Sequence, residues 1–455
     1  MNTWKISGLL CLLLTAALFG QQSSGITVIQ GATVITGTGR PAIRNAAIVI
    51  EGGKIRDIGT RAEVRTPSGA QTVNAGGKWI IPGLIDAHVH FDQSGGLYAR
   101  PDIIDLRKWR SYDKEIEFVR GRLPSTLERY IASGITGVVD CGGPMWTFDV
   151  RDLAARTPKA PRVAVAGPLI STAADPGLES SDPSVVTASS PEQARELVDK
   201  NLEHKPDFIK VLFIVNPGDN FQKLADIVTA AIAESHSHGV RAAVHAEELD
   251  TAKAALRAGA DILVHSVMDR PIDNEFLNLA QSRDVLYITT LGVDDGYRRV
   301  LTQSASPSDL EQKLGDPEVI ATWQELSKIP PGEIPGGIPA FPPARPRPVT
   351  FDNLMLMESA GARIVAGTDA GNIGTLHGPS LHHEFELMAA AGIRPSEIIT
   401  SATKNAAAVM GRQDELGTLE KGKAADLVIL DADPLADIKN TRRISKVMKA
   451  GQFVF

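Results

Sequence analysis

Short apolar runs alternate with amphipathic stretches through the middle of the chain. Eight of these runs are rich in apolar and β-branched residues and have the length of buried strands. They cover residues 85–90, 137–140, 162–166, 208–213, 242–245, 262–265, 285–289 and 363–367. Helical patterns separate several of them, and buried strands that alternate with helices indicate a parallel sheet. Because eight such strands close into a barrel, we expect an α/β fold, a (β/α)8 TIM barrel over residues 82–411. An open doubly wound sheet is the alternative.

Both ends of the chain show a different pattern, with short β-branched runs separated by glycine turns. Ala47–Ile50 near the N-terminus and Leu427–Leu430 near the C-terminus are examples. Neither end is long enough to bury a core alone. We therefore expect residues 25–81 and 412–455 to combine into one small β-sandwich beside the barrel.

Two long segments interrupt the alternation of strands and helices. Residues 92–123 follow the first strand, and residues 292–350 follow the seventh and carry eight prolines between Pro330 and Pro348. In a barrel both segments leave from strand C-terminal ends, where loops build the active site. Proline lacks a backbone donor, so we expect the Pro-rich insertion to run extended over the surface. Loops of this length are typical of lids or irregular segments.

The first 20 residues have the pattern of a secretory signal peptide. Lys5 precedes an apolar run from Ile6 to Phe19, and polar residues follow from Gln21. The run is shorter than the about 20 residues of a membrane span. We expect export, to the periplasm or outside the cell, with no membrane span after cleavage; a cytoplasmic protein with an apolar start is the alternative. Cleavage would leave Cys141 as the only cysteine, so no intramolecular disulfide is expected.

Charge and composition narrow the classes of partner. The net charge is −7, aromatic residues make up 5% of the chain, and no basic stripe is present. These features exclude an ordinary nucleic-acid-binding surface. We expect a small-molecule substrate, and the sequence is compatible with a homo-oligomer.

The first predicted strand ends in the sequence His88-Val89-His90. Side chains at positions i and i+2 of a strand point to the same face, so both imidazoles project together. Histidine nitrogen is a common ligand of zinc. The pair indicates a metal site at the mouth of the barrel.

Three further polar residues end other predicted strands. His245 ends the fifth, His265 the sixth and Asp369 the eighth. Buried polar groups are costly without partners, and a metal ion is one partner that all of them can share. Four imidazoles and one carboxylate at the same end of a barrel therefore predict a metal centre.

Lys210 lies within the apolar fourth strand, Phe208–Phe213. An ammonium group is expensive in such a place. One reading pairs the ammonium with an acid or places it at the barrel rim. The other is carbamylation of the amine by carbon dioxide, which would give an anionic ligand able to bridge two metal ions.

Three segments resemble the amidohydrolase superfamily. They are PGLIDAHVHF at the first strand, GTDAG at the eighth and GTLEKGKAADLVILDADPLADI near the C-terminus. With the histidines, the lysine and the aspartate, the chain is similar to the subgroup that binds two zinc ions through a carboxylated lysine. The spacing from Lys210 to His265 and the sequence GTLHG over 374–378 most resemble the branch of Xaa-Pro dipeptidases and zinc carboxypeptidases.

This resemblance implies a division of roles among the candidate residues. Zinc suits these ligands, although Mn, Fe, Co or Ni also fit. Two divalent metals would activate water for attack on an amide carbonyl, and Asp369 would act as general acid and base. His377 is the second catalytic candidate, which would bind substrate or steady the metal-bound oxygen, with an exposed loop histidine as the alternative. The implied metal ligands are His88, His90 and Asp369 on one ion, His245 and His265 on the other, and Lys210 as the bridge.

The sequence supports more than one function. The first hypothesis is hydrolysis of amide or peptide bonds in dipeptides or N-acyl amino acids. The second is a mononuclear deaminase or a cyclic-amide hydrolase similar to imidazolonepropionase, in which Glu247 or Glu248 would shuttle protons. Lys210 favours the first hypothesis, and under it we expect both glutamates to be helix N-terminal acids. A lactonase, a phosphotriesterase and a non-catalytic binding protein are minor alternatives.

Overall fold

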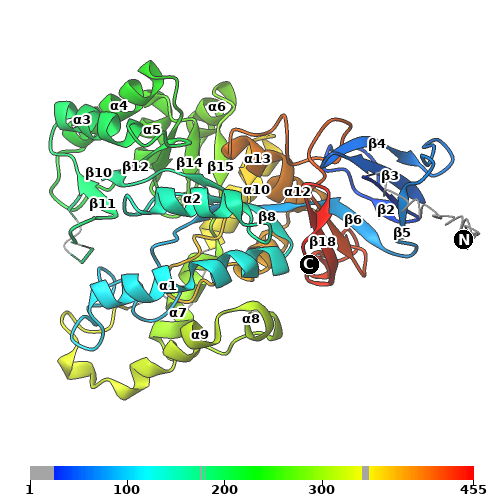
Figure 1. The fold of residues 1–455 in the computed structure, drawn as a ribbon. Helices are drawn as coiled ribbons and strands as arrows, with labels where there is room; N and C mark the ends of the chain where they lie inside the picture. The colour runs from blue at the N-terminus through cyan, green and yellow to red at the C-terminus, as the bar shows by residue number, and fades with distance from the viewer. Residues whose placement is uncertain (1–24, 175–176, 179, 341–347) are drawn as a thin grey trace, which may run out of the picture.

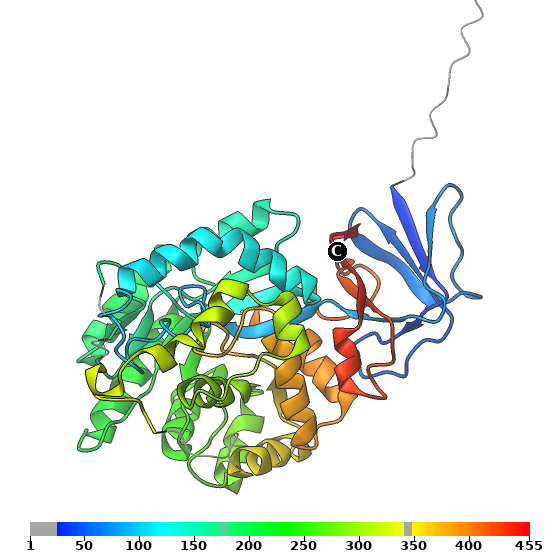
Figure 2. The ribbon, with the colours of Figure 1, turned by 90° about the horizontal axis from the view of Figure 1, so that it is seen from below.

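The computed structural model describes residues 25–174, 177–178, 180–340 and 348–455. The predicted signal peptide therefore lies outside the described residues. Figures 1 and 2 show a large α/β part and, at one side of it, a smaller all-β part where both ends of the chain meet. Among the described residues, no helix is both long and apolar enough to cross a membrane.

The α/β part is built on two parallel sheets. The larger contains, in spatial order, β11 (Val185–Thr187), β10 (Leu169–Ser171), β12 (Ile209–Leu212), β13 (Ala242–His245), β14 (Ile262–Val264), β15 (Leu286–Ile288) and β16 (Arg363–Val365). The smaller contains β7 (Leu84–Val89), β8 (Ile135–Asp140) and β9 (Arg162–Val165). Their residues are apolar and mostly buried, as in strands covered on both faces. The eight predicted strands are all present, with ends that differ by one or two residues.

Backbone hydrogen bonds join both edges of the smaller sheet to the larger one. The amide of Ala87 donates to the carbonyl of Ala366 at 3.2 Å, which links β7 to the end of β16. On the other side, the amide of Asp207 donates to Val165 at 2.9 Å, which links β9 to the segment before β12. The first predicted strand, β7, therefore lies next to the end of the eighth, β16.

Helices connect the strands and cover the parallel sheets (Figure 1). Several start at a polar cap: the Asn220 side chain accepts from the Lys223 amide, and Ser190 precedes a proline that opens its helix. Most of their apolar faces share one large cluster with the strands, and the helix at Ala406–Val409 packs in a second one. The helices of this layer are α2 (Thr147–Arg156), α3 (Pro191–Leu202), α4 (Phe221–Ser237), α5 (Leu249–Ala258), α6 (Asn274–Ser282), α10 (Pro348–Ser359), α11 (Ser380–Ala390), α12 (Pro395–Thr400) and α13 (Ala406–Val409).

Two small sheets form the all-β part. One has the order β4 (Lys54–Thr60), β3 (Ala46–Glu51), β1 (Ile26–Gln30) and β5 (Gln71–Asn74). The other has the order β19 (Gln452–Phe453), β18 (Ile444–Lys449), β17 (Leu427–Leu430), β6 (Trp79–Pro82) and β2 (Thr33–Val34). Pairing of β17 with β6 joins the two ends of the chain. Ile48 of one sheet and Leu427 of the other belong to the same apolar cluster.

Both long insertions contain more helix than the sequence indicated. α1 (Tyr112–Ala132) begins inside the first segment, where the Ser111 hydroxyl accepts from the Lys114 amide. The second contains α7 (Gly292–Leu301), α8 (Asp309–Leu314) and α9 (Pro317–Thr322). The expectation of irregular loops over 92–123 and 292–350 was therefore wrong for these stretches. The reason is tertiary packing. α1 buries Leu127 and Tyr130 in the main apolar cluster, and α7 and α9 pack in a separate cluster that includes Leu97 and Trp323. Residues 341–347 of the Pro-rich part lie outside the described structure.

Candidate metal centre

Two histidines and one aspartate converge at one end of the parallel strands. His88 lies in β7, His90 follows that strand, and Asp369 follows β16. The Nε2 atoms of the two histidines are 3.1 Å apart. Asp369 Oδ1 lies 3.4 Å from His88 Nε2 and 3.1 Å from His90 Nε2. All three side chains are buried, so the structure brings these three predicted ligands together.

A second group lies beside the first. His245 ends β13, His265 follows β14, and their ring centroids are 4.5 Å apart. Glu247 belongs to the same group: the ligand atoms of His245, Glu247 and His265 all lie within 4.8 Å of one another. The ring centroids of His265 and His88 are 5.0 Å apart. The two groups are therefore adjacent, as a centre with two metal positions requires.

Hydrogen bonds orient two of the imidazoles. His90 Nδ1 donates to the carbonyl of Gly142 at 2.6 Å, which leaves Nε2 free to bind a cation. His265 Nδ1 lies 2.6 Å from the hydroxyl oxygen of Thr290. Partners of this kind fix the ring orientation and the tautomer of metal-binding histidines.

Lys210 lies close to both groups. Its side chain is 1% exposed, and its charge acts on the pKa of three of the four histidines. Burial lowers the pKa of Lys210, and the carboxylates of Asp369 and Glu247 oppose this shift. A neutral amine is the form that carbon dioxide carbamylates, so burial favours that form and the carboxylates favour the ammonium.

Burial and neighbouring charges set the pKa values of the candidate ligands. Burial opposes a charge on His90, but Asp369 beside it raises the pKa of this ring. Burial lowers the pKa of His88 and of His245 well below the usual range, and it lowers that of His265 to about 3. Burial disfavours the charge of Asp369, but the neighbouring His88 and His90 hold its pKa well below the usual range. Neutral imidazoles beside an ionised carboxylate are the ligand forms that bind divalent metals.

The donor set also fits a metal on energetic grounds. Asp369 Oδ1 and His88 Nδ1 are buried and have no hydrogen-bond partner among the described residues. A buried polar atom left without a partner costs about 1–3 kcal/mol. A cation between the facing Nε2 atoms and Asp369 would remove this penalty for the carboxylate. Imidazole and carboxylate together suit zinc and its first-row neighbours.

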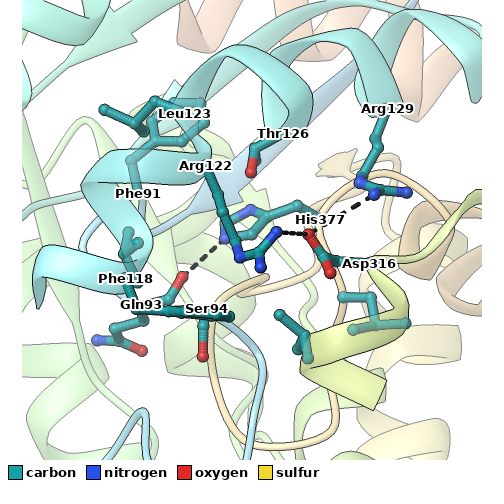
Figure 3. Close-up of a pocket in the computed structure, with 13 residues that line it drawn as sticks. Phe91, Gln93, Ser94, Phe118, Arg122, Leu123, Thr126, Arg129, Asp316 and His377 are labelled. Carbon is teal, nitrogen blue, oxygen red and sulfur yellow. Dashed lines mark hydrogen bonds and ion pairs between the residues drawn. The ribbon is translucent and has the colours of Figure 1, made fainter. Parts of the chain in front are cut away.

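His377 lies apart from these two groups and is not an exposed loop residue. It is 8% exposed, and its Nδ1 lies 2.7 Å from the Tyr130 hydroxyl. Its Nε2 donates to the carbonyl of Gln93 at 2.8 Å. Figure 3 shows His377 at the wall of a pocket under α1, where Arg122 and Arg129 approach Asp316. Both ring nitrogens of His377 are engaged, so its predicted contact with substrate remains a prediction.

Two features of the site were missed by sequence reasoning, and a third was given a smaller role. Glu247 was expected to be a helix N-terminal acid, with proton shuttling as the alternative; in the structure its carboxylate lies within 4.8 Å of the ligand atoms of His245 and His265, and its i+2 spacing from His245 was an available signal. Asp86, a lone acid in the buried β7, accepts from the amide and hydroxyl of Thr368 at 3.1 and 2.7 Å. Thr290 is the hydrogen-bond partner of His265, and no pattern in the sequence indicated this role.

A further buried histidine, His382, lies in α11 and is 1% exposed. Its Nε2 donates to the carbonyl of Ser133 at 3.0 Å, and its Nδ1 lies 2.9 Å from Thr441 Oγ1. The helical pattern around it could not show that α11 packs between α1 and the C-terminal segment.

Comparison with known proteins shows which family and which solved structures this chain resembles. The model of the amidohydrolase family matches residues 79–454. Imidazolonepropionase of Shouchella clausii (strain KSM-K16) is 25% identical over 450 residues, which cover 90% of this chain and 86% of that protein. Among solved structures, a Xaa-Pro dipeptidase with bound methionine in the active site has a TM-score of 0.69 at 23% identity, covering 94% of this chain and 99% of the other. A. niger ochratoxinase has a TM-score of 0.69 at 21% identity, covering 94% and 95%.

Proposed function

Because the chain belongs to the amidohydrolase family, we propose that it is a metal-dependent enzyme that hydrolyses amide or peptide bonds in small substrates such as dipeptides and N-acyl amino acids. One observation carries this proposal. Two groups of ligand atoms, the first buried and the second partly buried, each with two imidazoles and a carboxylate, lie side by side next to a buried lysine.

The residues divide between two metal positions. His88, His90 and Asp369 would hold one divalent ion, and His245 and His265 the other, with Lys210 as a carbamylated bridge. Zinc is the metal that this ligand set suits best. When bound, such ions lower the pKa of water and polarise a carbonyl.

Asp369 is the candidate general acid and base. Its Oδ1 lies among the Nε2 atoms of the first group, beside the place where water and the scissile carbonyl would meet. It would accept a proton from the attacking water and deliver it to the leaving nitrogen. Gly142 and Thr290 would keep the imidazoles in the orientation that this chemistry needs.

We also propose how the parallel strands and the two small sheets are arranged. We take β9 and β10 as two parts of one barrel strand, so that eight parallel strands close into a (β/α)8 barrel over residues 82–411. The two small sheets would then be a β-sandwich formed by residues 25–81 and 412–455. The site lies where the loops leave the strands, which is the catalytic face of such barrels.

A second candidate function has its own support. Glu247 lies beside His245 and His265, where a mononuclear deaminase or cyclic-amide hydrolase would use a proton-shuttling carboxylate. The likeness to an imidazolonepropionase along 90% of the chain points in the same direction. Lys210 has no evident task in a site with one metal, and for that reason we rank this function second.

Metal analysis combined with a substrate library tests the two candidates. Zinc-loaded protein would be offered dipeptides, N-acyl amino acids and cyclic amides. We expect release of free amino acids, and loss of at least about 100-fold in kcat in Asp369→Asn, whose amide cannot shuttle the proton. Ammonia release or opening of a cyclic amide, with one metal per chain, would support the second candidate and contradict the first.

Export remains a proposal that rests on residues 1–20 alone. Expression of the full chain followed by N-terminal sequencing of protein from the periplasm or the medium tests it. Cleavage near Gly20 would support export. An intact N-terminus on cytoplasmic protein would contradict it.

A further inference from the structure

Glu247 lies between β13 and the helix that follows it. α5 begins at Leu249, and its N-cap residue is Glu248. The Thr251 hydroxyl lies 3.2 Å from Glu248 Oε2. The Leu249 amide donates to Asp269 Oδ1 at 2.9 Å. The first amide of the helix is therefore bound by Asp269, a residue outside the helix.

The backbone holds Glu247 toward the centre of the fold. The amide of Ala246 donates to Val264 at 3.3 Å, and the carbonyl of Glu247 accepts from the Met268 amide at 2.8 Å. These bonds extend the pairing of β13 with β14 two residues beyond His245. In an extended segment, residues i and i+2 share a face. Glu247 consequently lies on the same side as His245, and its carboxylate is within 4.8 Å of the ligand atoms of His245 and His265.

The two groups of ligands have matching chemistry. The first consists of two imidazoles and the carboxylate of Asp369; the second consists of two imidazoles and the carboxylate of Glu247. Each set carries one negative charge when its histidines are neutral. Two histidines and one glutamate are a known three-ligand zinc set that leaves a fourth position open.

We propose that Glu247, with His245 and His265, forms a complete three-ligand position for the second divalent metal, which holds its ion whether or not Lys210 is carbamylated. This inference rests on the proposed metal-dependent function. Lys210 lies near both Asp369 and Glu247. As an ammonium it would offset part of their negative charge, and as a carbamate it would add a bridge to a position that is already formed.

The test measures metal stoichiometry in the full chain. Apoprotein would be reloaded with Zn²⁺ in bicarbonate-free buffer, desalted and analysed for bound metal; Co²⁺ loading would supply an absorption spectrum. The variants are Glu247→Gln, which keeps the shape but not the charge, Lys210→Met, and Glu248→Gln as the matched control on the neighbouring residue. Circular dichroism would compare the fold of all four proteins.

We expect two metals in the wild type, in Lys210→Met and in Glu248→Gln. Glu247→Gln should hold one tightly and bind the second at least about 10-fold more weakly, as expected when a ligand is lost. If Glu247→Gln does not fold, Glu247→Asp should instead shift the Co²⁺ spectrum of the second ion. Two tight metals in Glu247→Gln, or an unchanged spectrum in Glu247→Asp, would overturn the inference.

The same experiment distinguishes this inference from the proposed function. Wild-type protein that binds two metals through Glu247 but hydrolyses no amide would contradict the proposed reaction and support the inference. Amide hydrolysis by a protein whose second metal depends on bicarbonate and Lys210, but not on Glu247, would support the proposed reaction and contradict the inference.

Discussion

Of the eight described residues other than glycine that have a left-handed backbone conformation, three lie at the candidate metal centre. His265 has a φ of 74°, Asp369 has 58° and Thr290 has 48°. Residues other than glycine adopt such angles at a cost of about 1–3 kcal/mol and keep them only where surrounding contacts enforce them. Here the contacts are specific: the Asp369 amide donates to the carbonyl of His88 at 2.8 Å. The strain therefore falls on the residues whose position decides whether a metal can bind.

The hydroxyl of Thr290 should contribute to metal affinity through His265. Valine in place of Thr290 keeps the branched shape and removes the partner of His265 Nδ1. Loss of such a partner typically weakens metal binding 10–100-fold. We expect Thr290→Val to lower zinc affinity by about this factor in competition with a chelating dye. Thr302→Val, at an exposed hydroxyl bonded to the Arg298 carbonyl, is the control; equal affinities in the two variants would refute the role of Thr290.

His382 should make stability depend on pH. Burial lowers its pKa to about 4, below the about 6.5 of an unfolded histidine. As pH falls below 6.5 the unfolded chain binds a proton before the folded protein does, so the contribution of His382 is full above pH 6.5 and is lost toward pH 4. Up to about 3 kcal/mol is involved.

Chemical denaturation between pH 7 and pH 4 checks this prediction. The difference in unfolding free energy between the wild type and His382→Gln should shrink as pH falls, because glutamine does not titrate. Curves that stay parallel over this range would contradict it.

At the scale of elements, two glycines decide how α7 packs against the loop after β16. A Cβ on Gly296 would lie 2.8 Å from the carbonyl oxygen of Ile373 and 2.8 Å from Thr375 Oγ1. Gly374 has a φ of 82°, and a Cβ there would lie 2.4 Å from the carbonyl oxygen of Gly296. The Tyr297 hydroxyl donates to Asn372 Oδ1 at 2.5 Å in the same contact. Close approach of the two backbones is therefore what attaches the helical insertion to the segment that carries Asp369.

This contact predicts opposite effects for two changes from glycine to alanine in helices. Alanine normally stabilises a helix by about 1 kcal/mol relative to glycine. Gly121→Ala in α1 should show this gain, because a Cβ there meets nothing within 4 Å. Gly296→Ala should instead destabilise by about 1–3 kcal/mol through overpacking. Thermal unfolding would rank the variants: Gly121→Ala above the wild type and Gly296→Ala below it. An increase of Tm in both would show that the backbone contact has little energetic weight.

At the scale of the whole molecule, the metal centre joins segments that are distant in the chain. His88 and Asp369 lie 281 positions apart by their numbers (369 − 88) and belong to different edges of the parallel sheets. A ligand that binds only the folded protein stabilises it by about 4 kcal/mol at 1,000 times its Kd. Metal should therefore hold the first and the last predicted barrel strands together.

Metal removal should lower the thermal stability of the whole α/β part. We expect Tm to fall by several degrees after chelation and to recover on addition of Zn²⁺. Mg²⁺, which prefers oxygen ligands and octahedral geometry, should not restore it. Differential scanning calorimetry measures both steps. The same Tm for chelated and zinc-loaded protein would contradict a metal that bridges these strands.

What the sequence by itself determined follows from local rules. Strand positions were readable because buried parallel strands are short, apolar and bounded by helical patterns; residues 242–245 were predicted and β13 covers Ala242–His245. The candidate ligands were readable because polar residues at the ends of such strands meet at one edge of the sheet. The helices within residues 292–340 could not be predicted from the sequence, because they pack in an apolar cluster that includes residues far away in the chain.

Only the tertiary structure decided how side chains beyond the strand ends are oriented. Glu247 could have capped α5 or faced His245, and the pairing of its backbone with the segment after β14 chose the second. Burial of His377 and His382 likewise depends on helices that pack over them. Strand periodicity ends with the strand, and from there long-range packing, which no local pattern encodes, sets the direction of each side chain.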